Sequence, residues 1–385
     1  MRILIAPDKF KGCLNAREVA ENIAAGLRAV LPEAVIETMP VADGGEGTAV
    51  AIHEAAGGKW IVCPAHDALG RAIEARYSWL ADRSTAVMEM SEAAGLWRIA
   101  PQERDVLKAN TFGVGEMIDH ALKHGAKKIV VGLGGSATND GGFGMARALG
   151  FRFFAREKEL THGSAELLNL TRIVPKELPG NLTALSRQDR EGFARTFPKF
   201  TGAADVQNPL LGQRGATRVF GPQKGGTAEQ LEMLERGLER LAEVVSRDLG
   251  CDFRDAPGAG AAGGLGFGLM SFCGATLRSG FELVAEILGL AAAIDRADVV
   301  ITGEGRLDAQ TLEGKAPGGV ASIARSLGKP VHAIVGVTDA SAANGLFDSV
   351  TALVEGEVSQ EAAMINTAAL LRGRARTLAS RLRLN

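Results

Sequence analysis

Residues 2–12 read RILIAPDKFKG and contain the first strand of the pattern that decides the fold. Residues 2–6 form a short apolar run typical of a strand, and Pro7 ends it. A helical pattern follows, with Asn15 as N-cap and Glu18 at the spacing of a capping box. This order of strand, loop and helix is typical of a parallel sheet, whose ligands gather at the carboxyl ends of the strands.

The same order recurs along the chain. A second strand is predicted at 35–39, before the loop ADGGEGT and a helix over about 48–56. Near the other end, DVVIT at 298–302 has the composition of a buried strand and runs into GEGRLDAQT. The elements predicted after it are a helix over about 319–327, strands at 331–335 and about 350–354, and a closing helix over roughly 360–382. Both chain ends therefore contribute to one parallel-sheet domain.

The middle of the chain has a different pattern. Strands are predicted at 85–90 and 129–133, and a helix at 111–124. Residues 155–200 are polar and weakly patterned, whereas residues 229–249 form a clear amphipathic helix. This change of pattern indicates a second α/β domain.

Length and charge limit the organisation and the partners. The 385 residues are enough for roughly two domains. We predict that residues 62–285 form an inserted α/β domain, and that residues 1–61 and 286–385 together form the first domain. The 43 Lys and Arg residues nearly balance the 45 Asp and Glu residues, which argues against a nucleic acid or membrane partner bound through bulk charge.

Cysteine usage and the first residues bear on the compartment. The four cysteines are scattered and form no C-x-x-C pair, which favours reduced thiols over a disulfide framework or a zinc site. The first apolar run meets Pro7 and Asp8 too early for a signal peptide, and no stretch approaches the ~20 apolar residues of a membrane helix. We therefore expect a soluble cytoplasmic protein with no membrane partner.

Glycine is unusually frequent, and its 49 copies cluster in short loops that also carry acidic or hydroxyl side chains. Successive backbone N–H groups in such loops can bind an anion, although a single cluster is more often only a turn. Phosphoryl transfer needs this mixture, because N–H groups and Lys or Arg neutralise phosphates while one or two carboxylates hold Mg²⁺. The five segments of this kind are APDKFKG at 6–12, ADGGEGT at 42–48, GLGGSATNDGG at 132–142, NPLLGQRGATRVFGPQKGG at 208–226 and ITGEGRLDAQT at 301–311.

Common nucleotide and metal motifs are incomplete. A Walker A motif fails because Ala309 and Ala316 occupy its Gly and Ser/Thr positions. The G-x-G-x-x-G match that begins at Gly258 follows no predicted strand, as a dinucleotide fold requires. His120 and His124 have i,i+4 metal spacing without the glutamate of H-E-x-x-H, so a surface position is favoured over zinc binding.

Seven strings in this order resemble the bacterial glycerate kinase family, of the type that includes the glycerate 2-kinase of sugar-acid catabolism. They are APDKFKG, GLGGSATNDGG, DVQNPLLG, VFGPQKG, GAGAAGGLG, TGEGRLDAQT and GKAPGGVA, and they cover essentially the whole chain. The resemblance implies ATP-dependent phosphorylation of D-glycerate, with the 2-phosphate product favoured over the 3-phosphate. It also implies two α/β domains: a flavodoxin-like or Rossmann-like parallel sheet built from both chain ends, and an inserted domain of unusual topology.

On this resemblance we assign working roles to the loop residues. Asp140 is the candidate that orients or accepts the proton of the substrate hydroxyl, with Ser136 and Lys9 as the other catalytic candidates. Candidates for binding phosphate or the substrate carboxylate are Lys11, Gly134, Gly135, Asn139, Lys224 and Arg306. Candidates for Mg²⁺ ligands are Asp43 and Glu46, or Asp308. For each acid a turn or a helix cap is the alternative, and Ser136 could equally cap the helix that begins near Asp140.

Other functions stay open beside this one. The chain could be a regulator that binds a nucleotide or sugar acid and kept the loops without catalysis. It could also be a kinase for a neighbouring hydroxy acid such as tartronate. The expected partners are glycerate and ATP with Mg²⁺, and a homodimer is an open alternative.

Overall fold

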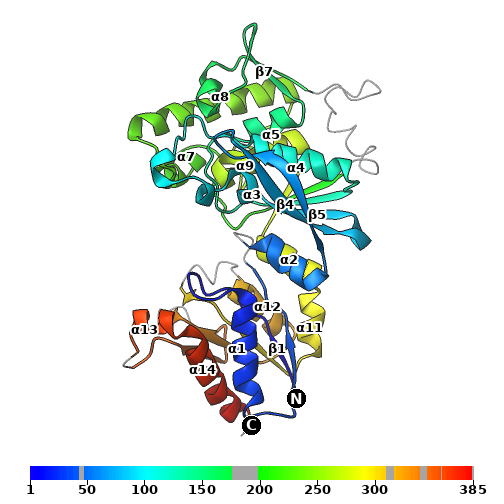
Figure 1. Ribbon diagram of the computed structural model, residues 1–385, viewed down its shortest axis with the longest axis vertical. Coiled ribbons are helices and arrows are strands. Elements are labelled where there is room, and N and C mark those ends of the chain that lie inside the picture. The colour runs from blue at the N-terminus through cyan, green and yellow to red at the C-terminus, as the bar shows by residue number, and fades with distance from the viewer. Residues whose placement is uncertain (43–46, 176–197, 309–315, 339–344, 357, 384–385) are drawn as a thin grey trace. The chain divides into compact units, whose positions relative to one another are not determined.

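The structure is a computed structural model that describes residues 1–42, 47–175, 198–308, 316–338, 345–356 and 358–383 (Figure 1). Contacts divide the chain into two compact units. Unit 1 comprises Met1–Asp43, Glu54–Ala56 and Ser279–Asn385, and unit 2 comprises Gly44–His53 and Gly57–Arg278. The predicted domain limits stay a prediction, because a unit defined by contacts need not be a segment that folds on its own.

Unit 1 contains a five-stranded sheet in the order β16-β14-β12-β1-β2, and every neighbouring pair is parallel. The parallel sheet predicted from both chain ends is thus confirmed. Beyond the ends of β12 and β14, two short strands form a separate parallel pair, β13 with β15. The strands are β1 (Arg2–Ile5), β2 (Val35–Thr38), β12 (Val299–Thr302), β13 (Arg306–Leu307), β14 (Val331–Val335), β15 (Val337–Thr338) and β16 (Ser349–Ala352).

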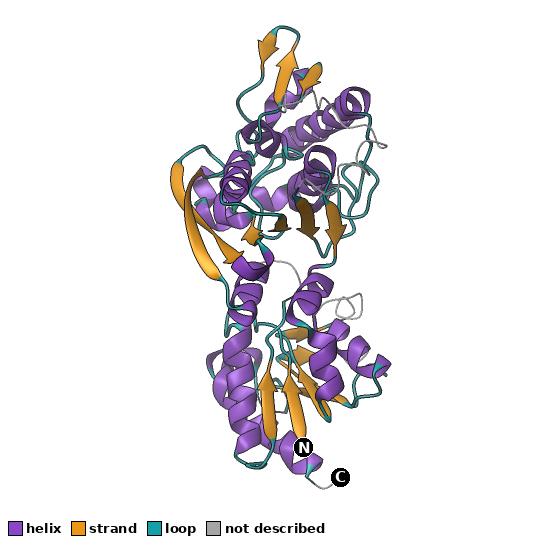
Figure 2. Ribbon diagram, turned by 90° about the vertical axis from the view of Figure 1, so that its right-hand side faces the viewer, coloured by secondary structure: helices purple, strands orange, loops and turns teal. Residues whose placement is uncertain are grey.

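Helices cover both faces of this sheet (Figure 2). Ile3 and Ile5 of β1 pack in one core cluster with α1 and α14, whereas Leu4 packs in another with α11 and α12. Successive side chains of a strand point to opposite faces of the sheet. Because both faces are buried here, every position of the strand favours an apolar residue. The helices of unit 1 are α1 (Ala16–Arg28), α10 (Gly280–Leu288), α11 (Leu290–Arg296), α12 (Ala316–Ser326), α13 (Gln360–Ile365) and α14 (Thr367–Leu382).

The single closing helix predicted over 360–382 is wrong. The chain forms α13 and α14, and Asn366 between them has φ −103° and ψ 18°. The Asn366 Nδ2 donates a hydrogen bond to the Ala362 carbonyl (3.1 Å). Asparagine competes for backbone groups in this way, which favours a helix boundary over an unbroken helix.

Unit 2 contains a six-stranded mixed sheet in the order β11-β10-β6-β5-β4-β3. The pairs from β11 to β5 are parallel, and the pairs β5-β4 and β4-β3 are antiparallel. In a smaller sheet, β8-β7-β9, the strands β8 and β9 lie in the segment predicted to be weakly patterned. The strands are β3 (Lys59–His66), β4 (Ala72–Leu80), β5 (Thr85–Glu89), β6 (Lys128–Gly132), β7 (Arg152–Ala155), β8 (Lys158–Glu159), β9 (Arg172–Val174), β10 (Lys199–Ala203) and β11 (Thr276–Arg278).

The amphipathic helix predicted at 229–249 is confirmed as α8, and Thr227 caps it with Gln230 in a capping box. Among the described residues, none of the helices combines the length and the apolar character needed to cross a bilayer. The remaining helices are α2 (Thr48–Ala56), α3 (Ser91–Ala94), α4 (Phe112–Lys123), α5 (Phe143–Ala148), α7 (Ala216–Phe220), α8 (Ala228–Leu249) and α9 (Ala261–Cys273). Short 3₁₀ turns lie at Ala81–Arg83, Leu96–Arg98, Pro101–Glu103, Ser164–Asn169 and Pro222–Lys224.

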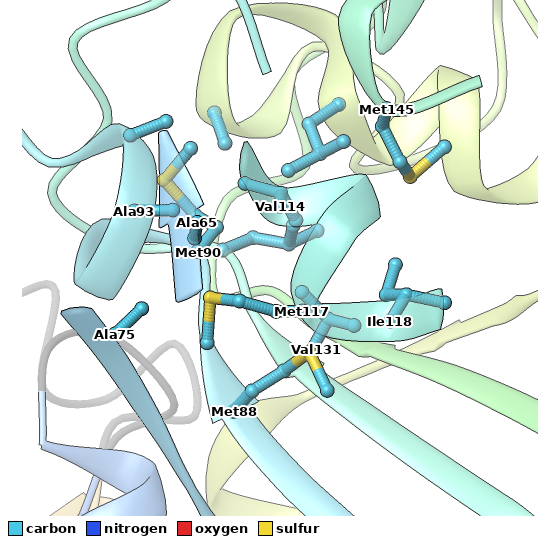
Figure 3. Close-up of a cluster of buried hydrophobic side chains, with 14 of the residues drawn as sticks. Ala65, Ala75, Met88, Met90, Ala93, Val114, Met117, Ile118, Val131 and Met145 are labelled. Carbon is cyan, nitrogen blue, oxygen red and sulfur yellow. The ribbon is translucent and has the colours of Figure 1, made fainter. Parts of the chain in front are cut away.

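A methionine-rich core joins β5, β6 and α4 in unit 2 (Figure 3). Met88 of β5, Val131 of β6 and Met117 of α4 are all buried there. The flexible thioether side chain fills irregular gaps between a sheet and a helix. This packing holds the carboxyl end of β6, from which the longest glycine loop begins.

Candidate active site

A cavity of about 410 Å³ lies at the carboxyl ends of the unit 1 strands. Its walls are residues that follow β1, β12, β14 and β16, one face of α13, and the start of α14. This is the edge at which a parallel α/β sheet is expected to bind ligands. The charged residues that line it are Asp8, Lys9, Lys11, Glu304, Arg306 and Asp308.

Backbone hydrogen bonds hold the loop that follows β1. The Asp8 N–H donates to the Gly303 carbonyl (2.8 Å), and the Asp8 Oδ1 accepts from the Lys9 N–H (2.6 Å). The turn at residues 10–14 is closed by a further backbone hydrogen bond (2.9 Å). The loop thereby presents Lys9, which is half-buried, and Lys11, which is exposed, at the cavity.

The loop that follows β12 approaches β14 too closely for a side chain at position 303. A Cβ added to Gly303 would lie 2.2 Å from the Ile334 carbonyl oxygen. Just beyond, the Gly336 N–H donates to the Glu304 carbonyl (3.0 Å), and β13 pairs with β15. Glycine in ITGEG therefore allows the chain to form the short strand pair that places Arg306 at the cavity.

Two carboxylates line the cavity although they are nearly buried. Asp8 is 7% exposed and Glu304 is 8% exposed. A carboxylate at such a position needs a cation or hydrogen-bond donors nearby, and the same cavity is lined by Lys9 and Arg306. Neither acid was among the site residues predicted from the sequence. The signal that would have found Glu304 is its place between two glycines directly after a buried strand.

The glycine loop of unit 2, residues 133–142, has an accessible part and a buried part. Gly135 is exposed at φ +68°, Gly134 is half-buried, and Ser136 is 9% exposed. The Leu96 N–H donates to the Gly135 carbonyl (2.9 Å), which holds the accessible part against the turn after α3. Gly134 and Gly135 are therefore accessible, whereas Ser136 is nearly buried. The ligand contacts predicted for the three residues stay predictions.

Asp140 belongs to the buried part of the loop and is 0% exposed. Its Oδ2 accepts from the Thr111 N–H (2.8 Å), the Thr111 Oγ1 (2.9 Å) and the Gly144 N–H (2.9 Å), and its Oδ1 accepts from the Gly142 N–H (3.1 Å). Burial raises the pKa of the carboxyl group, and these hydrogen bonds act in the opposite direction. The carboxylate has no exposed surface in this placement, and the predicted role as proton acceptor stays a prediction. The carboxylate joins the starts of α4 and α5.

Lys224 and Asn139 support the loop from within the protein. Lys224 is 1% exposed, and its Nζ donates to the Thr138 carbonyl (2.7 Å). Burial lowers the pKa of this ammonium group to about 7, against the smaller opposing effect of the Asp140 charge. Asn139 is 1% exposed, and its Nδ2 donates to the Thr217 Oγ1 (3.0 Å). Neither side chain is therefore accessible for the phosphate or carboxylate contact that was predicted for it.

A left-handed turn at the start of α9 packs against the same loop. Ala262, Gly263 and Gly264 have φ angles of 53°, 67° and 86°. The Gly141 N–H donates to the Gly263 carbonyl (3.1 Å), and a Cβ at Gly263 would lie 1.8 Å from the Thr138 carbonyl oxygen. The glycines of GAGAAGGLG therefore allow the start of α9 to touch the backbone of the glycine loop. This packing role agrees with the sequence prediction that these glycines do not form a dinucleotide-binding motif.

The predicted site residues that the structure describes thus lie in two groups. One group lines the unit 1 cavity and consists of Lys9, Lys11, Arg306 and Asp308. The other belongs to unit 2 and consists of Gly134, Gly135, Ser136, Asn139 and Asp140 in the glycine loop, with Lys224 bonded to that loop. The predicted metal ligands Asp43 and Glu46 lie outside the described residues.

The His120 Nδ1 lies 3.0 Å from the Tyr77 Oη, and its ring stacks with that of His124.

Thr111 and Thr217, which anchor the glycine loop, were not singled out from the sequence, because a lone threonine carries no signal. Gln360 and Met364 of α13 line the unit 1 cavity and were also missed. Their segment was predicted only as part of the closing helix over roughly 360–382.

The class of protein is an α/β protein with a charged cavity at the ligand-binding edge of a parallel sheet. The glycerate kinase family matches residues 3–383. The chain is 40% identical over 389 residues to the glycerate kinase of Bacillus subtilis strain 168, covering 100% of this chain and 98% of that protein. It is 42% identical over 341 residues to the glycerate 2-kinase of Escherichia coli strain K12, covering 87% of this chain and 85% of that protein.

A solved structure agrees with these relatives. The fold is similar to a crystal structure described as that of a glycerate kinase 2 from Salmonella typhimurium LT2. The TM-score is 0.86 at 42% sequence identity, over 100% of this chain and 98% of that one. The chain belongs to the glycerate kinase family, and it is a kinase.

Proposed function

We propose that this kinase transfers the γ-phosphoryl group of ATP to D-glycerate, releasing ADP and 2-phosphoglycerate. The observation that carries the proposal is the unit 1 cavity, where Lys9, Lys11 and Arg306 line the carboxyl edge of the sheet together with carboxylates. Cations at this edge can neutralise phosphate oxygens, which is the main requirement of phosphoryl transfer. The 2-phosphate product is supported by the similarity to a protein named glycerate 2-kinase.

In the proposed reaction, the oxygen of the C2 hydroxyl of glycerate forms a bond to the γ-phosphorus. The bond between that phosphorus and the oxygen bridging to the β-phosphate breaks, and ADP keeps the electron pair. The hydroxyl proton passes to a carboxylate or to water. Gly134, Gly135 and Ser136 are proposed to contact substrate, because the two glycines form the accessible part of the glycine loop and Ser136 follows them directly.

Asp140 is proposed as a positioning residue. Its carboxylate accepts hydrogen bonds from Thr111, Gly142 and Gly144. These bonds fix the buried part of the glycine loop, which follows Ser136. Lys224 acts in the same sense through the Thr138 carbonyl. Catalysis by positioning requires such a rigid support, since small displacements of a reacting group are costly in rate.

Mg²⁺ is the proposed cofactor, and the cavity residues fit it. Asp308, and the nearly buried Asp8 and Glu304, supply carboxylate oxygens in the same cavity as the phosphate-binding candidates. The part of the chain that the structure describes has no group of three or more His, Cys, Asp or Glu side chains arranged to hold a metal. Mg²⁺ needs only one or two protein carboxylates besides phosphate and water. When bound, it would neutralise negative charge on the phosphate oxygens.

An assay of ADP release with Mg·ATP and D-glycerate tests the proposed activity. We expect glycerate-dependent ADP formation and a phosphorus NMR spectrum of the product that matches 2-phosphoglycerate. A 3-phosphoglycerate spectrum would overturn the product assignment. ADP formation with tartronate but not with D-glycerate would favour a neighbouring hydroxy acid as substrate. The binding regulator would be favoured if no acid stimulated ADP release across several divalent metals.

We also propose a cytoplasmic location, supported by the four free thiols Cys13, Cys63, Cys251 and Cys273. A homodimer remains a prediction. Light scattering on the purified protein would decide it, because a monomer has the chain mass of 40.2 kDa.

A further inference from the structure

The unit 1 cavity has an apolar end that the proposed function leaves without a ligand. Besides its charged residues it is lined by Phe10, Val337, Leu353, Val354 and Met364. Phe10 is 3% exposed, whereas Met364 is 49% exposed. A half-exposed methionine at the mouth of a cavity is apolar surface that a ligand can cover.

One face of the helical segment after residue 359 forms this end of the cavity. Gln360, Ala363 and Met364 line it from α13, at the i, i+3 and i+4 spacing of one helix face, and Thr367 lines it from the start of α14. Gln360 adds a side-chain amide, which can donate and accept hydrogen bonds at once. The neighbouring Ile365 is 77% exposed and does not line the cavity.

The dimensions and the chemistry of this cavity do not suit glycerate alone. A volume of about 410 Å³ lies in the range of roughly 300–1,000 Å³ that holds drug-sized ligands, and a three-carbon acid is much smaller. Glycerate carries an oxygen on every carbon, so it has no apolar face to place against Phe10 and Met364. Apolar walls would desolvate its polar groups without replacing their hydrogen bonds.

We propose that this cavity is the nucleotide site, in which the adenine ring lies against Phe10 and Met364 and the Gln360 amide hydrogen-bonds to its edge. The phosphates then extend toward Lys9, Lys11 and Arg306, at the charged end of the same cavity. Aromatic rings pack favourably on thioether and aromatic side chains, and a glutamine amide can pair with two adjacent polar atoms of adenine. The inference rests on the proposed function, because it assigns ATP and not glycerate to this cavity.

The test uses the full-length protein and the variants Met364→Ala, Gln360→Ala and Ile365→Ala. For Met364→Ala we expect the KM for ATP to rise about threefold to tenfold with the KM for D-glycerate unchanged. For Gln360→Ala the preference for ATP over GTP should fall by about tenfold. Ile365→Ala is the matched control, one residue along the same helix and outside the cavity, and it should retain wild-type constants.

Calorimetric titration with ADP separates this inference from the proposed function. Weaker ADP binding by Met364→Ala than by Ile365→Ala supports the nucleotide site even if the wild-type protein phosphorylates no glycerate, a result that would refute only the proposed function. A raised KM for glycerate with unchanged ADP binding would assign the cavity to the acid and overturn the inference. Wild-type ADP binding by both Met364→Ala and Gln360→Ala would overturn it as well.

Discussion

Asp140 accepts hydrogen bonds from groups that lie just before or at the starts of two helices. Thr111 precedes α4, and Gly142 and Gly144 lie at the start of α5. Backbone N–H groups at a helix start have no partner within the helix, and the helix dipole favours a negative charge there. The local sequence GGSATNDGG identifies an acid in a glycine loop, but its hydrogen-bond partner Thr111 lies 29 residues away along the chain.

Asp140→Asn is expected to lower the free energy of unfolding by about 2–3 kcal/mol. The amide presents an NH₂ group to backbone N–H donors that need an acceptor. Urea denaturation measures the loss, and Asp82→Asn, whose side chain is 72% exposed, is the control that should change stability by less than about 0.5 kcal/mol. An Asp140→Asn protein with wild-type stability and no turnover would instead support Asp140 as the proton acceptor.

His332 is expected to make the protein sensitive to acid. Burial lowers the pKa of its imidazole below the ordinary 6.5; Arg325 adds to this effect, and Asp348 opposes it. The unfolded chain then takes up the proton first, so the stability that the neutral ring contributes is complete above about pH 6.5 and is lost as pH falls below it. The Nδ1 lies 2.8 Å from the Ser349 Oγ, within hydrogen-bond distance.

Denaturation of wild type and His332→Gln between about pH 7.5 and pH 5 measures this effect. Wild type should lose more stability than His332→Gln over that interval. His162→Gln, at a side chain that is 81% exposed, should retain the wild-type acid sensitivity. Parallel pH profiles for wild type and His332→Gln would contradict the argument.

At the scale of elements, the left-handed turn of α9 determines how closely two loops can approach. Its residues 262–264 have positive φ angles, and Gly263 lies against the Thr138 carbonyl. Such a conformation costs a residue with a Cβ roughly 1–2 kcal/mol, and direct overlap with a backbone atom costs more. The turn therefore supports the glycine loop through backbone contact and needs no charged side chain of its own.

Gly263→Ala and Gly274→Ala separate these two costs. Gly274 has φ +64° and open space where a Cβ would lie, so its substitution should lower the free energy of unfolding by only about 1–2 kcal/mol. Gly263→Ala should lower it by about 1–3 kcal/mol more, because its Cβ would meet the Thr138 carbonyl oxygen. Chemical denaturation measures the free energy of unfolding of both variants. Equal losses would mean that the glycine loop moves away from the new Cβ at no cost in free energy.

At the scale of the whole molecule, each unit contributes one group of candidate site residues. Unit 1 supplies the cavity, and unit 2 supplies the accessible glycine loop with Ser136. If both groups serve one reaction, a substitution in either unit lowers turnover while the fold remains intact. Kinetic constants and thermal unfolding of the same variants distinguish these effects.

Lys9→Met is expected to lower kcat/KM by about 10²-fold, since it removes a cation proposed to contact phosphate. Ser136→Ala should lower it by about tenfold, the worth of one hydrogen bond. Lys329→Met is the matched control in unit 1, because Lys329 precedes β14 at the opposite edge of the sheet from the cavity. An unchanged kcat/KM in Lys9→Met or in Ser136→Ala would remove that side chain from the active site.

Much of the fold could be predicted because its determinants are local. The run RILI is apolar throughout because β1 is covered on both faces, and the Asn15 capping box marks the start of α1. The site was predictable only as a set of loops. Lys9 and Arg306 line one cavity, but the helix break at Asn366 and the apolar face of α13 carry no comparable sequence signal.

The segment RILIAPDKFKG and the glycine loops by themselves determined the parallel sheet at both chain ends and the membership of a kinase family. Backbone geometry and the period of burial act over a few residues, so these features can be recognised without a structure. Tertiary structure alone decided that Asp140 and Lys224 are buried supports while Lys9 lines a cavity. The reason is that burial depends on distant segments, as when Lys224 reaches the Thr138 carbonyl from 86 residues away.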